Sequence, residues 1–231
     1  MVGPERPEAK VSTAERESVA ADLAGALPGA VLMAQHENAA NPSGYDETLA
    51  VDLLAQLGPV DAVAGAVGTG GSLCGLARGL RRRGSTARVI GVEPRGSIVF
   101  GGSGAPFYQS GTGVPPGVPL GDIVDFSLID EGCTVSDVAA FNTCRFLARR
   151  FALLIGGSAG GVVYAAAERL SRLHGRGLMV AIVGDGGERY LDTVFDDDWM
   201  SARGLLSTTV ETDLATVLAP VRREESADVA A

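Results

Sequence analysis

Short apolar runs alternate with segments of helical spacing along most of this chain. The runs at 61–67, 88–93 and 178–183 are rich in valine and isoleucine and typical of buried strands. Shorter apolar stretches at 30–34 and 124–129 are further strand candidates. Apolar residues at helical spacing predict helices over 14–27, 44–57, 73–83, 135–151, about 158–173 and 188–195. This alternation predicts a doubly wound α/β fold, with a mostly parallel sheet and helices on both faces.

The pattern also predicts the domain organisation. Residues 1–13 are polar, contain two prolines and are expected to form a disordered leader. Residues 14–202 are expected to form one α/β domain, and 203–231, where the pattern stops, a flexible tail. Inside the domain, 96–121 is rich in glycine and proline and forms the longest irregular stretch. Such loops in a compact domain are often functional.

Composition narrows the function classes. A formal net charge of −9 argues against a nucleic-acid partner. No apolar run is long enough for a membrane span, and the first residues lack a signal-peptide core, so we expect a cytoplasmic protein. Cys74, Cys133 and Cys144 are widely spaced, which fits neither a zinc site nor a disulfide framework. Buried free thiols and no metal site are expected.

The most informative stretch is the glycine-rich turn that follows the strand at 61–67. Gly68, Thr69, Gly70, Gly71 and Ser72 lead directly into a helix. Glycines allow a tight turn whose N–H groups converge on an anion, and the start of the helix adds unpaired N–H groups. Thr69 and Ser72 supply hydroxyls, and Ser72 could cap the helix. The spacing matches neither a P-loop nor a dinucleotide fingerprint. A phosphate-binding cup and an ordinary strand-to-helix turn both remain open.

Six segments in chain order resemble one family. They are Asn-Ala-Ala-Asn-Pro at 38–42, Gly-Thr-Gly-Gly-Ser at 68–72, Gly-Val-Glu-Pro-Arg-Gly-Ser at 91–97, Gly-Thr-Gly at 111–113, Gly-Gly-Ser-Ala-Gly at 156–160, and Asp-Gly-Gly-Glu-Arg-Tyr at 185–190 with Phe195, Asp198 and Trp199. Together they resemble the cysteine synthase and cystathionine β-synthase branch of the fold-type II pyridoxal-phosphate (PLP) enzymes, which share the tryptophan synthase β-like fold.

The resemblance implies a PLP cofactor in the domain at 14–202. Its phosphate would be held by Gly68, Thr69, Gly70, Gly71 and Ser72, and its pyridine nitrogen by the Ser158 hydroxyl. A neutral hydroxyl there suits β-elimination and β-replacement. The implied substrate is a small amino acid, an O-activated serine or cysteine, which reacts through an aminoacrylate. From the residues alone, an N-cap of the following helix is the favoured interpretation of Ser158.

Two departures from the family pattern stand out. The family carries a Schiff-base lysine in an opening segment and a Ser/Thr-Ser-Gly-Asn-Thr-Gly type loop in a small domain, and both are largely missing here. Lys10 is the only lysine, and it lies in the polar leader without matching surroundings, so we assign no catalytic residue.

Three hypotheses follow. The chain could be one half of a split enzyme, with a lysine-bearing partner chain in a homo- or hetero-oligomer. It could be a truncated, inactive homologue that only binds. A dehydratase- or racemase-like activity is disfavoured, because those relatives tend to carry a Ser-Gly-Gly-Gly phosphate loop.

Four further features have a structural and a functional interpretation. His36 and His174 could be acid–base groups, but a surface histidine and a helix C-terminal cap are favoured. The arginines at 81–83 are expected to form a solvated face at the end of a helix rather than an anion site. Arg95 could meet an anionic substrate group, although a surface position is favoured.

Overall fold

The computed structural model describes residues 13–172 and 177–218. Within them, four parallel strands form one sheet in the order β3-β2-β1-β4. The strands are β1 (Ala62–Ala66), β2 (Arg88–Pro94), β3 (Glu131–Val135) and β4 (Met179–Ala181). Because crossovers place helices on both faces, this arrangement confirms the predicted doubly wound α/β class.

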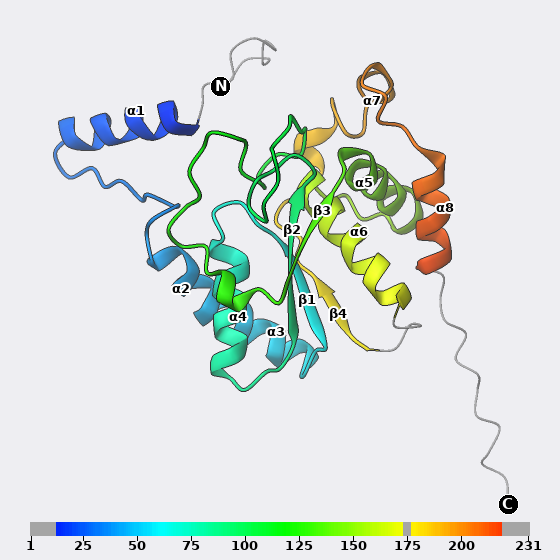
Figure 1. Cartoon of the computed structure of the whole chain (residues 1–231), viewed down its shortest axis with the longest axis horizontal. Coiled ribbons are helices and arrows are strands. Elements are labelled where there is room, and N and C mark those ends of the chain that lie inside the picture. The colour runs from blue at the N-terminus through cyan, green and yellow to red at the C-terminus, as the bar shows by residue number, and fades with distance from the viewer. Residues whose placement is uncertain (1–12, 173–176, 219–231) are drawn as a thin grey trace, which may run out of the picture.

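Helices cover the sheet in two layers (Figure 1). One layer holds α2 (Ala40–Glu47), α3 (Leu49–Leu57) and α4 (Gly71–Arg82), and the other holds α5 (Asp137–Phe151), α6 (Gly157–Arg172) and α8 (Thr208–Val217). α7 (Asp197–Ala202) lies beside the second layer, whereas α1 (Thr13–Ala26) extends away from the body. Short 3₁₀ turns occupy Phe126–Leu128 (η1) and Glu188–Tyr190 (η2).

Alternation along β1 divides the core in two. Val63 points into the cluster formed with α4, whereas Ala62 and Ala64 point into the cluster formed with α5 and α6. All three are at most 5% exposed. Successive side chains of a strand face opposite sides, so a strand covered on both sides reads as one continuous apolar run. This is the physical reason the sequence predicted β1 and β2 correctly.

A stripe of glycines on α4 lets α2 and the start of α3 lie close against this helix. A Cβ on Gly71 would lie 2.1 Å from Asn41 Oδ1, one on Gly75 2.2 Å from the Pro42 carbonyl oxygen, and one on Gly79 2.4 Å from the Ala50 Cβ. The three glycines are four residues apart and therefore share one face of the helix. Larger side chains would force the two helices apart.

Ion pairs close the far end of this contact. The Asp46 carboxylate is 3% exposed and accepts from Arg82 Nη1 at 2.8 Å and Arg83 Nη1 at 3.1 Å. The hydrogen bond from Arg82 lowers the Asp46 pKa below its usual 3.8, against the opposing effect of burial. These arginines therefore have a structural partner, which supports the structural interpretation of the run at 81–83.

The third strand was predicted in the wrong place. Residues 124–129 contain η1 rather than a strand, and β3 follows at Glu131–Val135. The Asp125 carboxylate accepts from the Ser127 N–H at 3.1 Å and from its hydroxyl at 2.6 Å, which closes a tight turn. The helix after β3 begins at Asp137, two residues later than predicted, and Ser136 caps it through the Ala139 N–H at 3.2 Å.

Other boundaries also differ. Residues 30–34 contain no strand, and Val31 and Met33 there are 79% and 68% exposed. The helix expected over 188–195 is only η2, because a new helix starts later, where Asp196 caps α7 through the Trp199 N–H at 2.6 Å. The helix expected over 44–57 is divided at Thr48, whose hydroxyl donates to the Gly44 carbonyl oxygen at 2.7 Å.

The expected tail contains an ordered element. Within 203–231, α8 packs on α5 and α6 and buries Leu214 to 2% exposure. Nearby, the Asn142 side chain on α5 donates to the Leu205 carbonyl oxygen at 2.7 Å and accepts from the Ser207 N–H at 3.1 Å. The expected leader at 1–13, except Thr13 at the start of α1, lies outside the described residues, as does 219–231.

The Asp46 pair makes a pH-dependent contribution to stability. We expect Asp46→Asn to lower the melting temperature at pH 7 by about 2–6 °C, because a charged acceptor becomes a neutral amide. The folded-state pKa is depressed, so this stabilisation is complete above pH 3.8 and is lost as the pH falls through the lower folded value. Thermal unfolding should show the two proteins converging in acid, whereas Asp22→Asn on exposed α1 should behave as wild type throughout.

Candidate functional site

The glycine turn lies at the carboxyl edge of the sheet, between β1 and α4. Gly70 adopts φ +86° and is the N-cap position of α4. A Cβ at Gly70 would also lie 2.8 Å from Val124 Cγ2. Backbone conformation and close packing therefore both require glycine there. Ser72 lies inside α4 and makes no capping hydrogen bond, so it does not serve as the helix cap that the sequence left open.

The turn presents several free donors. Within the described chain, the amide N–H groups of Thr69, Gly70, Ser72 and Leu73 have no hydrogen-bond partner. The Gly71 N–H donates to Thr69 Oγ1 at 3.2 Å, which fixes that hydroxyl over the turn. Converging N–H groups at the start of a twelve-residue helix suit an anion such as phosphate.

The segment at 38–42 lies against this turn. Asn41 Nδ2 donates to the Gln35 carbonyl oxygen at 2.7 Å and lies 3.5 Å from Thr69 Oγ1. Its amide oxygen occupies the space that a Gly71 side chain would need. The Asn-rich loop and the glycine turn, 28 residues apart, therefore form one unit.

The Gly-Thr-Gly segment at 111–113 closes over the turn from the other side. The Gly113 N–H donates to the Val67 carbonyl oxygen at 2.8 Å, and the Thr112 hydroxyl to the same oxygen at 3.3 Å. A Cβ on Gly68 would lie 3.3 Å from the Gly111 carbonyl oxygen. The long irregular stretch is thus fastened to the end of β1.

A cavity of about 650 Å³ opens between these segments. It is lined by Gly68 and Thr69, by Gln35 and His36, and by much of 105–119. The Nε2 atom of His36 lies 3.7 Å from the Glu17 carboxylate on α1, and His36 also lines the cavity. A volume of this size accommodates a small organic molecule.

A buried glutamate anchors the start of the irregular stretch. Glu93 on β2 is 0% exposed, and its carboxylate accepts from the Val99 N–H at 2.9 Å and the Phe100 N–H at 3.2 Å. Sequence reasoning noticed the Val-Glu-Pro segment but assigned Glu93 no task. Its neighbour Arg95 is exposed and does not line the cavity, which supports the surface interpretation.

Ser158 lies in the first turn of α6, at the same edge of the sheet. It is 8% exposed, and its hydroxyl has no hydrogen-bond partner within the described residues. The preceding Gly156 N–H donates to the Asp185 carbonyl oxygen at 3.1 Å, which fastens this turn beside the end of β4. Of the predicted site residues, Gly68 and Thr69 line the 650 Å³ cavity, whereas Ser158 does not, although its turn lies at the same edge of the sheet.

Asp185, a half-buried residue of the segment at 185–190 to which sequence reasoning assigned no role, lies beside the Ser158 turn. Asp185 Oδ2 accepts from the Tyr190 hydroxyl at 2.6 Å, whereas its buried Oδ1 has no partner in the described chain. Burial, and then the hydrogen bond to Asp185, raise the pKa of Tyr190 to about 12. The side chain of Ser110, which lines the cavity, opposes this rise in the pKa of Tyr190. The pair therefore links the Ser158 turn to the cavity-lining loop.

The remaining candidates have structural surroundings. Cys74 and Cys144 are buried free thiols as expected, and burial raises the pKa of the Cys144 thiol to about 12. Cys133 on β3 is only half-buried, because that strand is an edge of the sheet. His174 lies outside the described residues. No group of histidine, cysteine and acidic side chains in the described parts could hold a metal ion.

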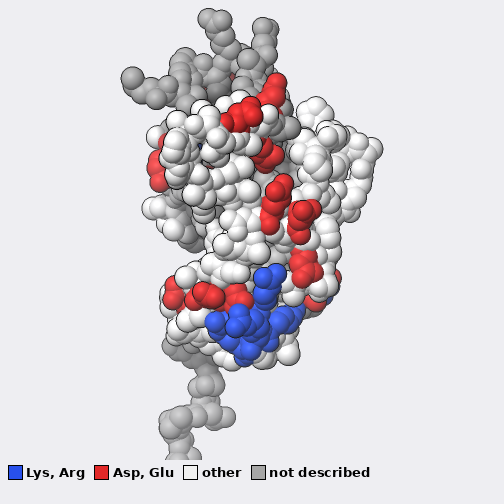
Figure 2. Space-filling model, turned by 90° about the vertical axis from the view of Figure 1, so that its left-hand side faces the viewer, with Lys and Arg blue, Asp and Glu red and all other residues white. Residues whose placement is uncertain are grey.

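Figure 2 shows one patch of basic side chains with acidic side chains close by, as expected where the arginines at the end of α4 pair with Asp46 and Asp130. Among the described residues, the helices are too short or too polar to cross a bilayer.

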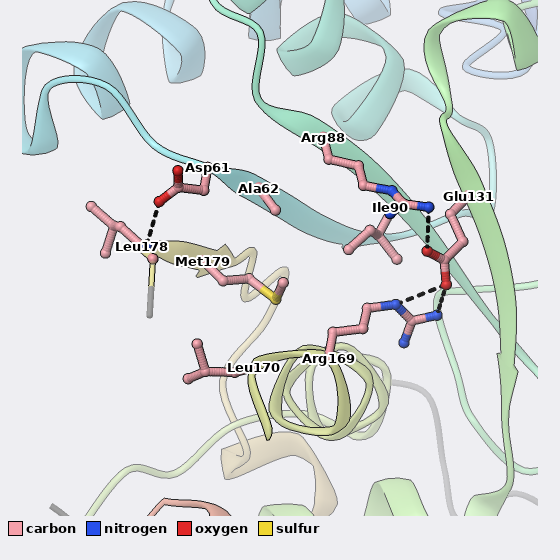
Figure 3. Close-up of a pocket in the computed structure, with 10 residues that line it drawn as sticks. Asp61, Ala62, Arg88, Ile90, Glu131, Arg169, Leu170, Leu178 and Met179 are labelled. Atoms are coloured by element: carbon pink, nitrogen blue, oxygen red, sulfur yellow. Dashed lines mark hydrogen bonds and ion pairs between the residues drawn. The ribbon is translucent and has the colours of Figure 1, made fainter. Parts of the chain in front are cut away.

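A second cavity of about 250 Å³ lies at the opposite, amino-terminal edge of the sheet (Figure 3). Glu131 accepts there from Arg88 Nη2 at 3.0 Å and from Arg169 Nε at 2.9 Å. Leu178 donates its N–H to Asp61 Oδ2 at 2.7 Å. The charged side chains that line this cavity therefore all have partners, which indicates a structural role.

Comparisons with known proteins agree with this geometry. The family described as "Pyridoxal-phosphate dependent enzyme" matches residues 6–185. A protein of Sinorhizobium fredii named "Putative cysteine synthase" is 48% identical over 208 residues, which cover 90% of this chain and 62% of that protein. A cysteine synthase of Helicobacter pylori is 38% identical over 172 residues, which cover 74% of this chain and 55% of that protein.

A solved structure gives the same result. An O-acetylserine dependent cystathionine β-synthase from Helicobacter pylori superposes with a TM-score of 0.66 and 36% identity, covering 75% of this chain and 56% of that one. The chain therefore spans little more than half the length of these relatives.

The Asp185–Tyr190 hydrogen bond can be tested by alkaline titration. The pKa of Tyr190 is raised in the folded state, so its stabilisation is complete below pH 10 and is lost as the pH rises through about 12. We expect Tyr190→Phe to be less stable than wild type at pH 8 and to lose less stability between pH 10 and 12, measured by urea unfolding. An equal loss in both proteins would contradict this assignment.

Proposed function

We propose a function for this chain from the premise that it belongs to the pyridoxal-phosphate dependent enzyme family, whose members use PLP. The proposed role is the cofactor-binding part of a cysteine synthase-like enzyme. Such an enzyme replaces or eliminates the β-substituent of an O-activated serine or of cysteine. The Schiff-base lysine would come from a separate segment, because Lys10 is the only lysine in these 231 residues.

The residues present fit the cofactor. Free amide groups at Thr69, Gly70 and Ser72 match a phosphate dianion at the start of a helix. The unpartnered Ser158 hydroxyl matches a ring nitrogen as hydrogen-bond acceptor. The observation that carries the proposal is this pair of features at one sheet edge, in a chain 48% identical to a protein named a cysteine synthase.

In this proposal each group has one task. Gly68 to Ser72 bind and orient the phosphate, and Ser158 donates to the ring nitrogen without giving it a charge. PLP, when bound, supplies the electron sink for loss of the β-substituent. The cavity beside Gly68 and Thr69 holds the amino-acid substrate, and the loop at 105–119 limits the access of water to it.

The phosphate site can be tested without a lysine. Pyridoxine 5′-phosphate lacks the aldehyde, so its binding reports only non-covalent contacts. We expect Gly71→Ala to weaken its binding about tenfold or more, because the new Cβ displaces Asn41 from the turn. Calorimetry on folded protein gives the affinity.

Gly44→Ala is the matched control. It places a methyl group on α2 where nothing lies within 4 Å, so binding should be unchanged. Wild type should also bind pyridoxine 5′-phosphate more tightly than pyridoxine. Equal affinities for the two compounds would exclude the phosphate site.

The catalytic part of the proposal predicts complementation. The 231-residue chain mixed with PLP should keep no visible absorption band after dialysis. Adding a lysine-bearing fragment of the Sinorhizobium fredii relative should produce a stable band, and borohydride should fix the cofactor to the lysine of that fragment.

Two outcomes would contradict it. A borohydride-stable adduct within this chain would show that no second lysine is needed. A docked fragment that never yields the band would favour the alternative, a catalytically inactive homologue that acts only by binding.

A further inference from the structure

Gln109 connects the 650 Å³ cavity with the helix that carries Ser158. It lines the cavity as part of the loop at 105–119, yet only 4% of the residue is exposed. Its amide oxygen lies 2.8 Å from the position that a Cβ on Gly161 of α6 would occupy. Gly161 follows Ser158 by three residues, so both lie on the same face of α6. One side chain therefore touches the cavity and the face of the helix that carries Ser158.

Hydrogen bonds fix the position of this side chain. Gln109 Nε2 donates to the Val135 carbonyl oxygen at 3.0 Å and to Asp137 Oδ1 at 3.2 Å. Val135 ends β3 and Asp137 begins α5, so both acceptors belong to one junction of the fold. Both amide hydrogens are thus used, and the amide oxygen is directed at Gly161. A glutamine held in this way is a spacer of fixed length between the loop and α6.

Main-chain groups hold the loop independently of this amide. The Tyr108 N–H donates to Asp137 Oδ2 at 2.9 Å, and the Gln109 N–H donates to Asp137 Oδ1 at 3.2 Å. The Val135 carbonyl oxygen also accepts from the Arg95 N–H at 2.8 Å. Removal of the Gln109 amide would therefore leave each of these backbone groups with a partner. Because the loop is attached without the amide, its contact with α6 is what distinguishes Gln109.

The preceding residue reaches the same helix by a second route. Tyr108 packs edge-on against Trp199 with ring centroids 5.7 Å apart, and Trp199 packs against Phe141 at 6.1 Å. The Phe141 ring lies 2.8 Å from the position of a Cβ on Gly157, which directly precedes Ser158. Two successive loop residues thus make contacts that lead to the first turns of α6.

We propose that Gln109 is a positioning residue, which sets the distance between the cavity loop and α6 at which the Ser158 hydroxyl meets the cofactor ring. The proposal rests on the proposed function, because it takes Ser158 as the group that binds the ring nitrogen. Glycine at 161 belongs to the same arrangement. A methyl group there would press on the Gln109 amide oxygen, whereas its contact with the Ala140 Cβ would be an ordinary 3.7 Å.

Two ligands separate the ring contact from the phosphate contact. Inorganic phosphate reports only the glycine turn at 68–72, whereas pyridoxine 5′-phosphate also reports the ring. We expect Ser158→Ala to weaken binding of pyridoxine 5′-phosphate about tenfold. Gln109→Met removes both side-chain hydrogen bonds at nearly constant length and should weaken it about fivefold. Calorimetry on the 231-residue chain should show inorganic phosphate binding within about twofold of wild type in both variants.

Gly161→Ala disturbs the same contact from the side of the helix. Alanine favours a helix more than glycine does, so the melting temperature should not fall. Pyridoxine 5′-phosphate binding should still weaken about fivefold, because the new methyl group displaces the Gln109 amide. A residue with a purely structural role would not give this combination. Gln56→Met on the exposed face of α3 and Gly44→Ala on α2 are matched controls, and both should bind the two ligands as wild type does.

Combined substitutions test whether Gln109 acts through Ser158. In the Ser158→Ala background, Gln109→Met should cause less than about a twofold further loss, because effects that pass through one contact are not additive. An additional loss as large as in wild type would overturn the positioning role.

The remaining outcomes separate the two proposals. A loss of ring binding with Ser158→Ala, but none with Gln109→Met or Gly161→Ala, would overturn the positioning role and leave the proposed cofactor site intact. An equal loss of inorganic phosphate binding in folded Gln109→Met and Gly161→Ala would also overturn it, because the effect would not be confined to the ring. Unchanged ring binding in Ser158→Ala would reject the proposed ring contact and the positioning role together.

Discussion

The close approach of α2 to α4 is the contact on which the candidate site depends. It exists because Gly71, Gly75 and Gly79 leave one face of α4 without side chains. The Pro42 carbonyl oxygen and the Ala50 methyl group occupy the space so created, and Asn41 lies over the start of the helix. A methyl group at Gly75 would lie 2.2 Å from the Pro42 carbonyl oxygen, so the two helix backbones would have to move apart. The same packing therefore holds the helices together and places Asn41 at the turn, and the Asp46 ion pairs fix the opposite end of the helix contact.

The site that results is built mainly from backbone. The free amides of the glycine turn, the Val67 carbonyl oxygen that receives Gly113, and the Asp185 carbonyl oxygen that receives Gly156 are all main-chain groups. They are held by strands β1 and β4, which are neighbours in the sheet. Ligand sites at the carboxyl ends of parallel strands commonly use this arrangement, because helix starts and strand ends meet there. The side chains then add hydroxyls, at Thr69 and Ser158, rather than charges.

The sequence predicted what periodicity and glycine spacing encode. Buried apolar runs and helical spacing predict β1, β2 and α4. The turn before α4 follows from glycines at positions where the backbone is left-handed or closely packed, such as Gly70. The prediction failed where a local polar contact overrides the pattern. Asp125 closes η1 within an apolar stretch that resembles a strand. Asn142 holds the chain at Leu205 through a hydrogen bond between residues 63 positions apart, which local periodicity does not reveal. The segment that contains α8 was therefore predicted to be a tail. The hydrogen bond between Tyr190 and Asp185 was not predicted for a similar reason, because it depends on the conformation of the turn that follows β4.

Binding and catalysis are separable in such a site. The fold that forms the proposed phosphate cup needs β1, α4 and α2, all within the described chain, and none of the contacts described there involves a lysine. A nucleophilic amine serves only the covalent step, so its segment can be contributed from elsewhere without disturbing the cup.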